Sequence, residues 1–208
     1  MALHFAQPPE ASMSALNAIL PRIATRTSVA TNAPNLGYAV GAALRRGQEG
    51  APPTLAPISA PVHVLGLDQL AKGADVAKTK PKLWTHLLHG EADAAPIAEA
   101  DLDATNHGFA ALTEGDPITA LGKRIRALES ESLKSDQDYD LAMIRVPALS
   151  LTAVWMKGRG GAPDVVIPNE SPQSPLTAGK RYTLAEFNAA LRPIAQAMMA
   201  QDDGDLGG

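Results

Sequence analysis

The stretch YDLAMIRVPALSLTAVWMKG, residues 139–158, decides the fold class of this chain. Apolar residues dominate on both sides of Pro147, and residues that favour strands, such as Val, Ile and Trp, are frequent among them. Proline cannot donate a hydrogen bond to a strand ladder, so Pro147 belongs at a bulge or an edge. The stretch therefore predicts two strands, or one bent strand.

Shorter strand signals lie on both sides of this stretch. The glycine-rich segment KGRGGAPD, residues 157–164, predicts a hairpin loop that leads into Val165, Val166 and Ile167. An apolar alternation at 62–65 predicts one more short strand. We expect a small antiparallel sheet built from residues 62–65, 139–157 and 164–167.

Helical patterns surround these strands. Helices are predicted over 80–89, over 116–130 with Pro117 in the first turn, and over 183–200, where a Thr-x-x-Glu capping box opens the pattern. Apolar spacing and helix breakers together favour a broken helix over 91–113. The fold class is therefore predicted to be α+β, with helices packed on a small sheet.

Composition divides the chain into four parts. The stretch QEGAPPTLAPISAP, residues 48–61, contains four prolines and predicts an extended linker. It separates an N-terminal helical arm, 1–47, from an α+β body, 62–200. The acidic, glycine-rich end of the chain, 201–208, is predicted to be disordered.

The arm is predicted to carry two short amphipathic helices. Helices of this size bury little surface alone, so they need the body or a partner chain. We expect their apolar residues to form a partner-binding surface: Met13, Leu16, Leu20, Ile23, Leu36, Val40 and Leu44.

Charge and composition narrow the classes of partner. The chain contains 18 Lys and Arg residues and 22 Asp and Glu residues, so its net charge is -4. This negative charge argues against nucleic acid as a partner. The chain has no cysteine, which excludes disulfides and thiolate chemistry and agrees with a cytoplasmic location. The N-terminus has no signal-peptide pattern and no apolar run is long enough for a membrane span, so we expect no membrane partner.

Two stretches offer oxygen and nitrogen ligands for a metal ion. The first has two histidines three residues apart on a predicted helix, and the second is EADLDATNH, residues 99–107, whose alternating carboxylates would line one face of a strand. The candidate metal ligands are His86, His89, Asp101, Asp103 and His107. Surface histidines and an exposed acidic segment are the competing interpretation.

Catalytic motifs are missing from the sequence. It contains no G-x-S-x-G elbow, no S-x-x-K and no His-Glu-x-x-His pattern. We therefore expect a non-catalytic binding or assembly module, without a cofactor, whose arm contacts another copy or a partner subunit. The alternatives are a small metal-dependent enzyme using His86, His89 and the 99–107 neighbourhood, and an adaptor that docks through its C-terminal tail.

Overall fold

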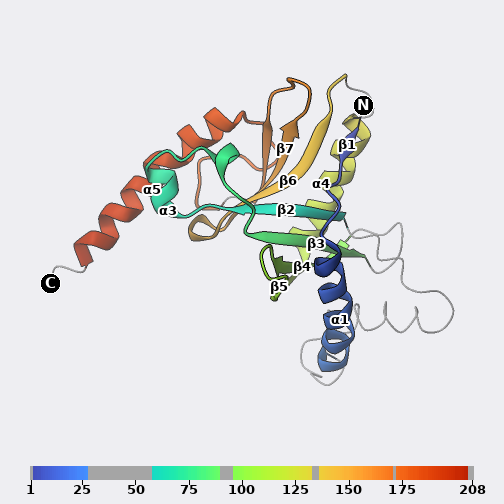
Figure 1. The fold of residues 1–208 in the computed structure, drawn as a ribbon. Helices are drawn as coiled ribbons and strands as arrows, with labels where there is room; N and C mark the ends of the chain where they lie inside the picture. Colours follow the sequence, from blue (N-terminus) through green and yellow to red (C-terminus); the bar gives the residue numbers. More distant parts are fainter. Residues whose placement is uncertain (1, 28–57, 90–95, 133–135, 171, 206–208) are drawn as a thin grey trace. The chain divides into compact units, whose positions relative to one another are not determined.

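The computed structural model of the chain describes residues 2–27, 58–89, 96–132, 136–170 and 172–205 (Figure 1). Within these ranges there are four α-helices, two short 3-10 helices and eight strands of a mostly antiparallel sheet. This confirms the predicted α+β class. None of the helices in the described ranges has the length and apolar character needed to cross a membrane.

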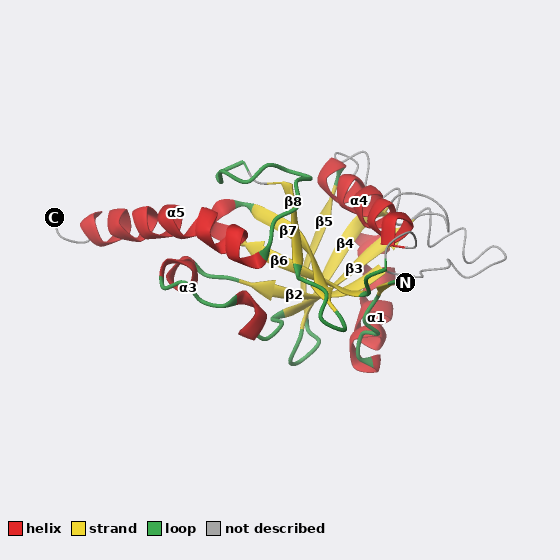
Figure 2. Ribbon diagram, turned by 90° about the horizontal axis from the view of Figure 1, so that it is seen from above, coloured by secondary structure: helices red, strands yellow, loops and turns green. Residues whose placement is uncertain are grey.

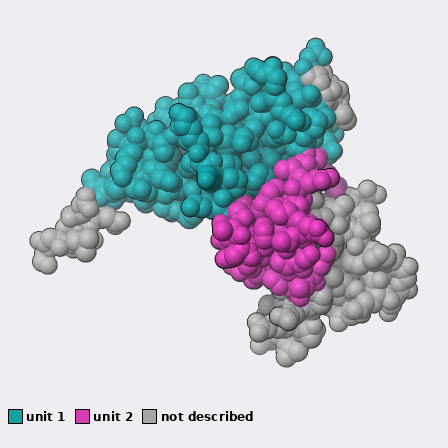
Figure 3. Space-filling view, in the orientation of Figure 1, with its two compact units in different colours: residues 1–4, 61–82, 128–208 teal, residues 5–60, 83–127 magenta. Residues whose placement is uncertain are grey.

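The chain divides into two compact units (Figure 3). Unit 1 comprises residues 1–4, 61–82 and 128–208, and unit 2 comprises residues 5–60 and 83–127. This division cuts across the predicted arm, linker and body.

Unit 1 is built around the stretch that opened the sequence analysis. It contains the strands β1 (Leu3–His4), β6 (Tyr139–Val146), β7 (Leu151–Gly158) and β8 (Val165–Glu170), and most of β2 (Ile58–Val64). β6 pairs antiparallel with β7, which pairs antiparallel with β8, whereas β1 and β2 both run parallel to β6. A 3-10 turn, Pro147–Leu149, separates β6 from β7, so the two-strand interpretation is confirmed and Pro147 lies outside the ladder.

Two helices complete unit 1. α3 (Leu67–Ala71) and α5 (Leu184–Asp205) contact each other (Figure 2). The predicted capping box is present, because the Glu186 amide donates to Thr183 Oγ1 and the Thr183 amide donates to the Glu186 carboxylate. The core contains Trp155 and Phe187, each fully buried. α5 continues to Asp205, into the stretch for which the sequence predicts disorder.

Unit 2 contains an antiparallel three-stranded segment. Its strands are β3 (Leu83–His89), β4 (Pro96–Asp103) and β5 (Phe109–Glu114), and β4 pairs with both neighbours. The predicted helix over 80–89 and the predicted broken helix over 91–113 are therefore wrong. Both faces of β3 and β4 carry buried residues, which removes the alternation that distinguishes a strand from a helix.

Two helices also contribute to unit 2. In α1 (Glu10–Thr27), Leu16 and Leu20 are buried against a cluster on β3 and β4 that includes Leu88 and Leu102. α4 (Asp116–Ser132), which matches the helix predicted over 116–130, is mostly in this unit.

The last four residues of the predicted linker, 58–61, belong to β2, and Pro61 lies within this strand. The rest of the linker lies outside the described residues.

Candidate functional site

The predicted partner surface of the arm is divided by the structure. Leu16 and Leu20 are 1% and 2% exposed and pack within unit 2. Met13 is half-buried. The side chain of Ile23, and residues Leu36, Val40 and Leu44, lie outside the described part of the chain. The two buried leucines are core residues of unit 2 and do not form a surface available to a partner.

His86, the first candidate metal ligand, is fully buried on β3 and joins three elements of unit 2. Its Nδ1 lies 2.9 Å from Ser59 Oγ on β2, and its Nε2 lies 3.1 Å from Ser12 Oγ in the first turn of α1. A neutral imidazole has one N–H donor and one acceptor nitrogen, so one serine accepts from the ring and the other donates to it. Both ring nitrogens are therefore engaged by the chain itself.

Burial keeps this imidazole neutral. Desolvation lowers the pKa of His86 from 6.5 to about 4, although the negative charge of Asp101 acts in the opposite direction. The interpretation of His86 as a surface histidine at the end of a helix is wrong, because the residue lies on a buried strand. His89 is also on β3, but its side chain lies outside the described residues.

The carboxylates of β4 share one face, as the alternation in EADLDATNH predicts. Asp101 is opposite Thr85 in the β3–β4 register, and the Thr85 hydroxyl donates to the Glu99 carboxylate at 2.5 Å. Glu99 and Asp101 are 4% and 2% exposed, so the interpretation of an exposed acidic segment is wrong.

These residues do not converge as a metal centre. His86 is opposite Ala100, on the other face of the strands from Asp101. Asp103 accepts hydrogen bonds from the amides of Thr105 and Asn106 in the β4–β5 turn, where His107 has a φ of 58°. Among the residues that the structure describes, no three His, Asp or Glu side chains are placed to hold a metal ion.

Unit 1 contains a second buried histidine that sequence reasoning missed. His63 on β2 is 2% exposed, and its Nδ1 lies 2.9 Å from Thr79 Oγ1. The Thr79 hydroxyl donates its one proton to the Val76 carbonyl at 2.7 Å, so its oxygen accepts from the Nδ1–H of His63. This hydrogen bond fixes the tautomer and leaves the lone pair on Nε2.

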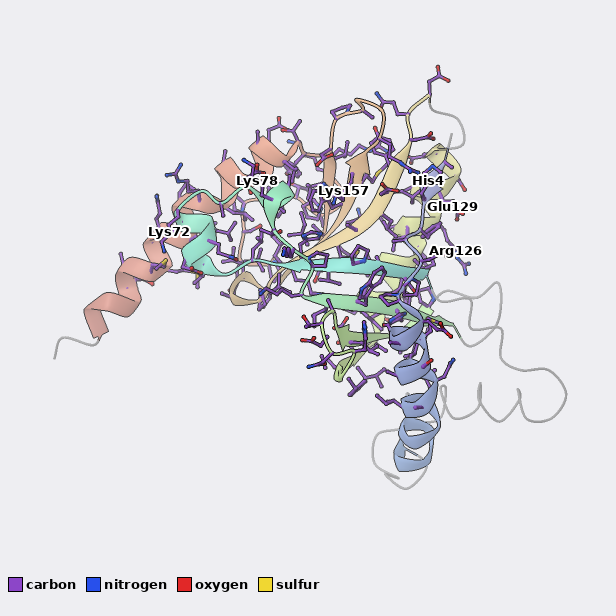
Figure 4. All side chains as sticks on the ribbon, in the orientation of Figure 1. His4, Lys72, Lys78, Arg126, Glu129 and Lys157 are labelled. Atoms are coloured by element: carbon purple, nitrogen blue, oxygen red, sulfur yellow. The ribbon has the colours of Figure 1, made fainter. Side chains whose placement is uncertain are left out.

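The surroundings of His63 disfavour its charged form. Its ring meets Trp155 edge-on, with the centroids 4.9 Å apart. The Lys157 ammonium lies 4.7 Å from the centre of the same indole, and Figure 4 labels this lysine. Burial, followed by the charge of Lys157, lowers the pKa of His63 to about 4. Its low exposure keeps the ring out of reach of a substrate.

A polar cavity of about 400 Å³ lies in unit 1, where Asp136 and Asp138 face the β7–β8 loop that contains Arg159. Two of its three charged residues, Asp138 and Arg159, contact neighbouring residues. Asp138 Oδ1 accepts from the Ala2 amide at 2.8 Å, and Arg159 Nε lies 3.6 Å from Asp140 Oδ2. The loop turns through residues with positive φ at Gly160 and Gly161, as expected for a hairpin loop rather than a phosphate cradle at a helix N-terminus.

The edge strand β5 is the remaining candidate, and it is exposed. Among the described strands it pairs with β4 alone, so its outer edge has no strand partner within the described residues. Phe109, the first residue of β5, is 41% exposed. Among the described residues it is the one large apolar residue that is exposed to solvent. Glu114, at the end of β5, is its one charged residue. Strand edges with few charges can accept further strands.

Comparisons of the chain with protein-family models, with curated proteins and with solved structures find no match.

Proposed function

We propose that the protein is a non-catalytic binding or assembly module, and that the outer edge of β5 is its partner-binding surface. The observation that carries the proposal is the exposed Phe109 on β5, a strand that pairs with β4 alone among the described strands. The surface differs from the one expected at sequence level, because Leu16 and Leu20 of the arm are engaged within unit 2.

The energetics favour a partner at this position. A phenylalanine side chain offers about 200 Å² of surface. Covering the 41% that is exposed in Phe109 would gain roughly 2 kcal/mol at about 25 cal/mol per Å². Main-chain hydrogen bonds to the edge would add affinity, as in other complexes formed by strand addition.

The two alternative functions have less support. A metal-dependent enzyme would need His86 and the acidic residues of β4 to converge, whereas they lie on opposite faces of the strands. An adaptor function through the C-terminal tail would rest on residues 201–208, of which 201–205 are helical and 206–208 lie outside the described residues.

Site-specific photo-crosslinking tests the proposal. A photoreactive phenylalanine analogue would replace Phe109 in the cells that naturally make the protein. The matched control would carry the analogue at Ala120, an exposed position on α4 of the same unit. We expect a covalent protein adduct at position 109 and none at position 120. No adduct at 109, or equal adducts at both positions, would reject β5 as the binding surface.

A further inference from the structure

We infer that His86 holds α1 against the sheet of unit 2 at neutral pH and that α1 is released when the imidazole takes up a proton. This inference goes beyond the proposed function, because it concerns the N-terminal helix and not the edge of β5. It rests on the position of the ring between two elements that are attached to the sheet in different ways.

The two serines that contact His86 belong to elements of unequal attachment. Ser59 lies on β2, a strand that is hydrogen-bonded into the sheet. Ser12 lies in the first turn of α1, a helix that packs on the sheet through side chains such as Leu16 and Leu20. Main-chain ladders open less readily than a helix that is docked by a few side chains. A loss of stability at His86 is therefore expected to release α1 first.

Protonation adds a charge at this contact without removing a hydrogen bond. A charged imidazole donates from both nitrogens, and each serine oxygen can accept. Nε2 of His86 lies 3.1 Å from Ser12 Oγ in the first turn of the 18-residue helix, where the helix dipole is positive. The ring is also 0% exposed, so the new charge would be buried. Repulsion from the helix end and burial of charge are both relieved when α1 leaves.

The elements around the ring carry other charged and titratable residues. These are Glu10, Arg22 and Arg26 of α1, His63 of β2, His89 of β3, Glu99, Asp101 and Asp103 of β4, and Glu114 of β5. Burial lowers the pKa of His86 from 6.5 to about 4, and the charge of Asp101 reduces this shift without reversing it. The docked state therefore binds the proton more weakly than a released state in which solvent reaches the ring.

The direction and size of the effect follow from this difference. Release becomes more favourable as the pH falls from about 6.5 to about 4, and its dependence on His86 levels off below that value. Between pH 7.5 and 4.5 the equilibrium constant for release rises on the order of 70-fold, if the exposed ring has its ordinary pKa of 6.5. A released α1 would expose Leu16 and Leu20, as the sequence predicts for the arm.

Thiol labelling tests this inference, because the chain contains no cysteine of its own. Ala98→Cys places the only thiol in the apolar cluster on which α1 packs. Ala60→Cys is the matched control in the same unit, on the face of β2 opposite to Ser59. Ala98 and Ala60 are 0% and 1% exposed. Release of α1 uncovers position 98 alone, whereas unfolding of unit 2 uncovers both positions.

The probe is a pyridyl disulfide reagent, which reacts with thiols even at acidic pH. Each labelling rate is divided by the rate of the same variant unfolded in urea at the same pH. Circular dichroism would establish that the variants are folded, and Leu16→Cys and Leu121→Cys replace Ala98→Cys and Ala60→Cys if either is not.

We expect the normalised rate at position 98 to rise on the order of 70-fold from pH 7.5 to 4.5. At pH 4.5 it should exceed the rate at position 60 by at least about tenfold. Combining Ala98→Cys with His86→Asn should remove most of the rise. Equal rates at positions 98 and 60 would overturn the inference, because unit 2 would then open as a whole. A rise that persists with His86→Asn, or no rise at all, would also overturn it, since His86 would not control the release.

Discussion

Acidification should destabilise unit 2 through His86. The imidazole is fully buried between Ser12 and Ser59, and burial lowers its pKa from 6.5 to about 4. The unfolded chain therefore binds a proton at a higher pH than the folded chain does. Stability is fully retained above about pH 6.5, falls as the pH drops toward 4, and stops changing through this group below that value.

The size of the effect follows from the two pKa values. One pH unit corresponds to about 1.36 kcal/mol for a single proton. The interval from 6.5 to about 4 therefore gives a loss of roughly 3 kcal/mol in the free energy of unfolding. Domains of ordinary stability have about 5–15 kcal/mol in total, so this one histidine would remove a large share of it.

Urea unfolding at pH 7.5, 6.5, 5.5 and 4.5 measures this loss. His86→Asn keeps an amide between the two serines but cannot take up a proton, so we expect its free energy of unfolding to fall less steeply with pH. Near pH 5 its slope should be smaller than that of the natural chain by about 1.4 kcal/mol per pH unit.

Leu16→Ala is the control, since it removes a buried apolar side chain of the same unit and no titratable group. We expect this variant to lose stability at every pH and to keep the natural slope. Identical slopes for the natural chain and His86→Asn would refute the reasoning, because they would mean that His86 does not take up the proton on unfolding.

Three further predictions concern packing and can be checked by thermal or urea unfolding. Gly122→Ala would place a Cβ 2.0 Å from Cγ of Pro96, so we expect a destabilisation of about 1–3 kcal/mol; an unchanged midpoint would contradict this close approach. Leu16→Ala removes a buried side chain from unit 2 and should cost about 2–5 kcal/mol, whereas a cost below about 1 kcal/mol would mean that α1 is not docked. Asp164→Ala removes the acceptor 3.0 Å from the indole Nε1 of Trp155 and should cost about 1–3 kcal/mol with a shift in tryptophan emission; unshifted emission would argue against this bond.

Part of the fold could be predicted from the sequence because local signals agree with the tertiary structure. In residues 139–167, strand-forming residues are bounded by proline and glycine, and the structure has strands there with Pro147 between β6 and β7. The helix that begins after Thr183 was predictable for the same reason, because its capping box is local. Such segments need no information from distant residues.

The strands of unit 2 could not be predicted in this way. Leu87 and Leu88 are both buried although they point to opposite faces of β3, so the apolar pattern does not alternate. Pro81 and Gly90 flank this segment and favour a helix by their positions at its two ends. The buried carboxylate of Glu99 depends on the Thr85 hydroxyl, a partner 14 residues away.

The candidate site was even less accessible from the sequence. Ser12 and Ser59 lie 74 and 27 residues from His86, so no motif of ordinary length contains all three. Edge exposure is likewise a property of the sheet. Nothing in the sequence around Phe109 marks β5 as the strand that pairs with one neighbour only among those described.

The chemistry of the two buried histidines favours a function outside them. A catalytic histidine needs a partner that stabilises its charged form and a nitrogen that can reach the substrate. The hydrogen bonds described above join both ring nitrogens of His86 to serine hydroxyls and Nδ1 of His63 to a threonine hydroxyl, and a neutral ring can make all of these bonds. A buried polar group without a partner costs about 1–3 kcal/mol, so these hydroxyls are explained by folding alone. Folding of the described residues does not explain the exposure of Phe109 in the same way, because it leaves a large apolar side chain 41% exposed at the start of β5.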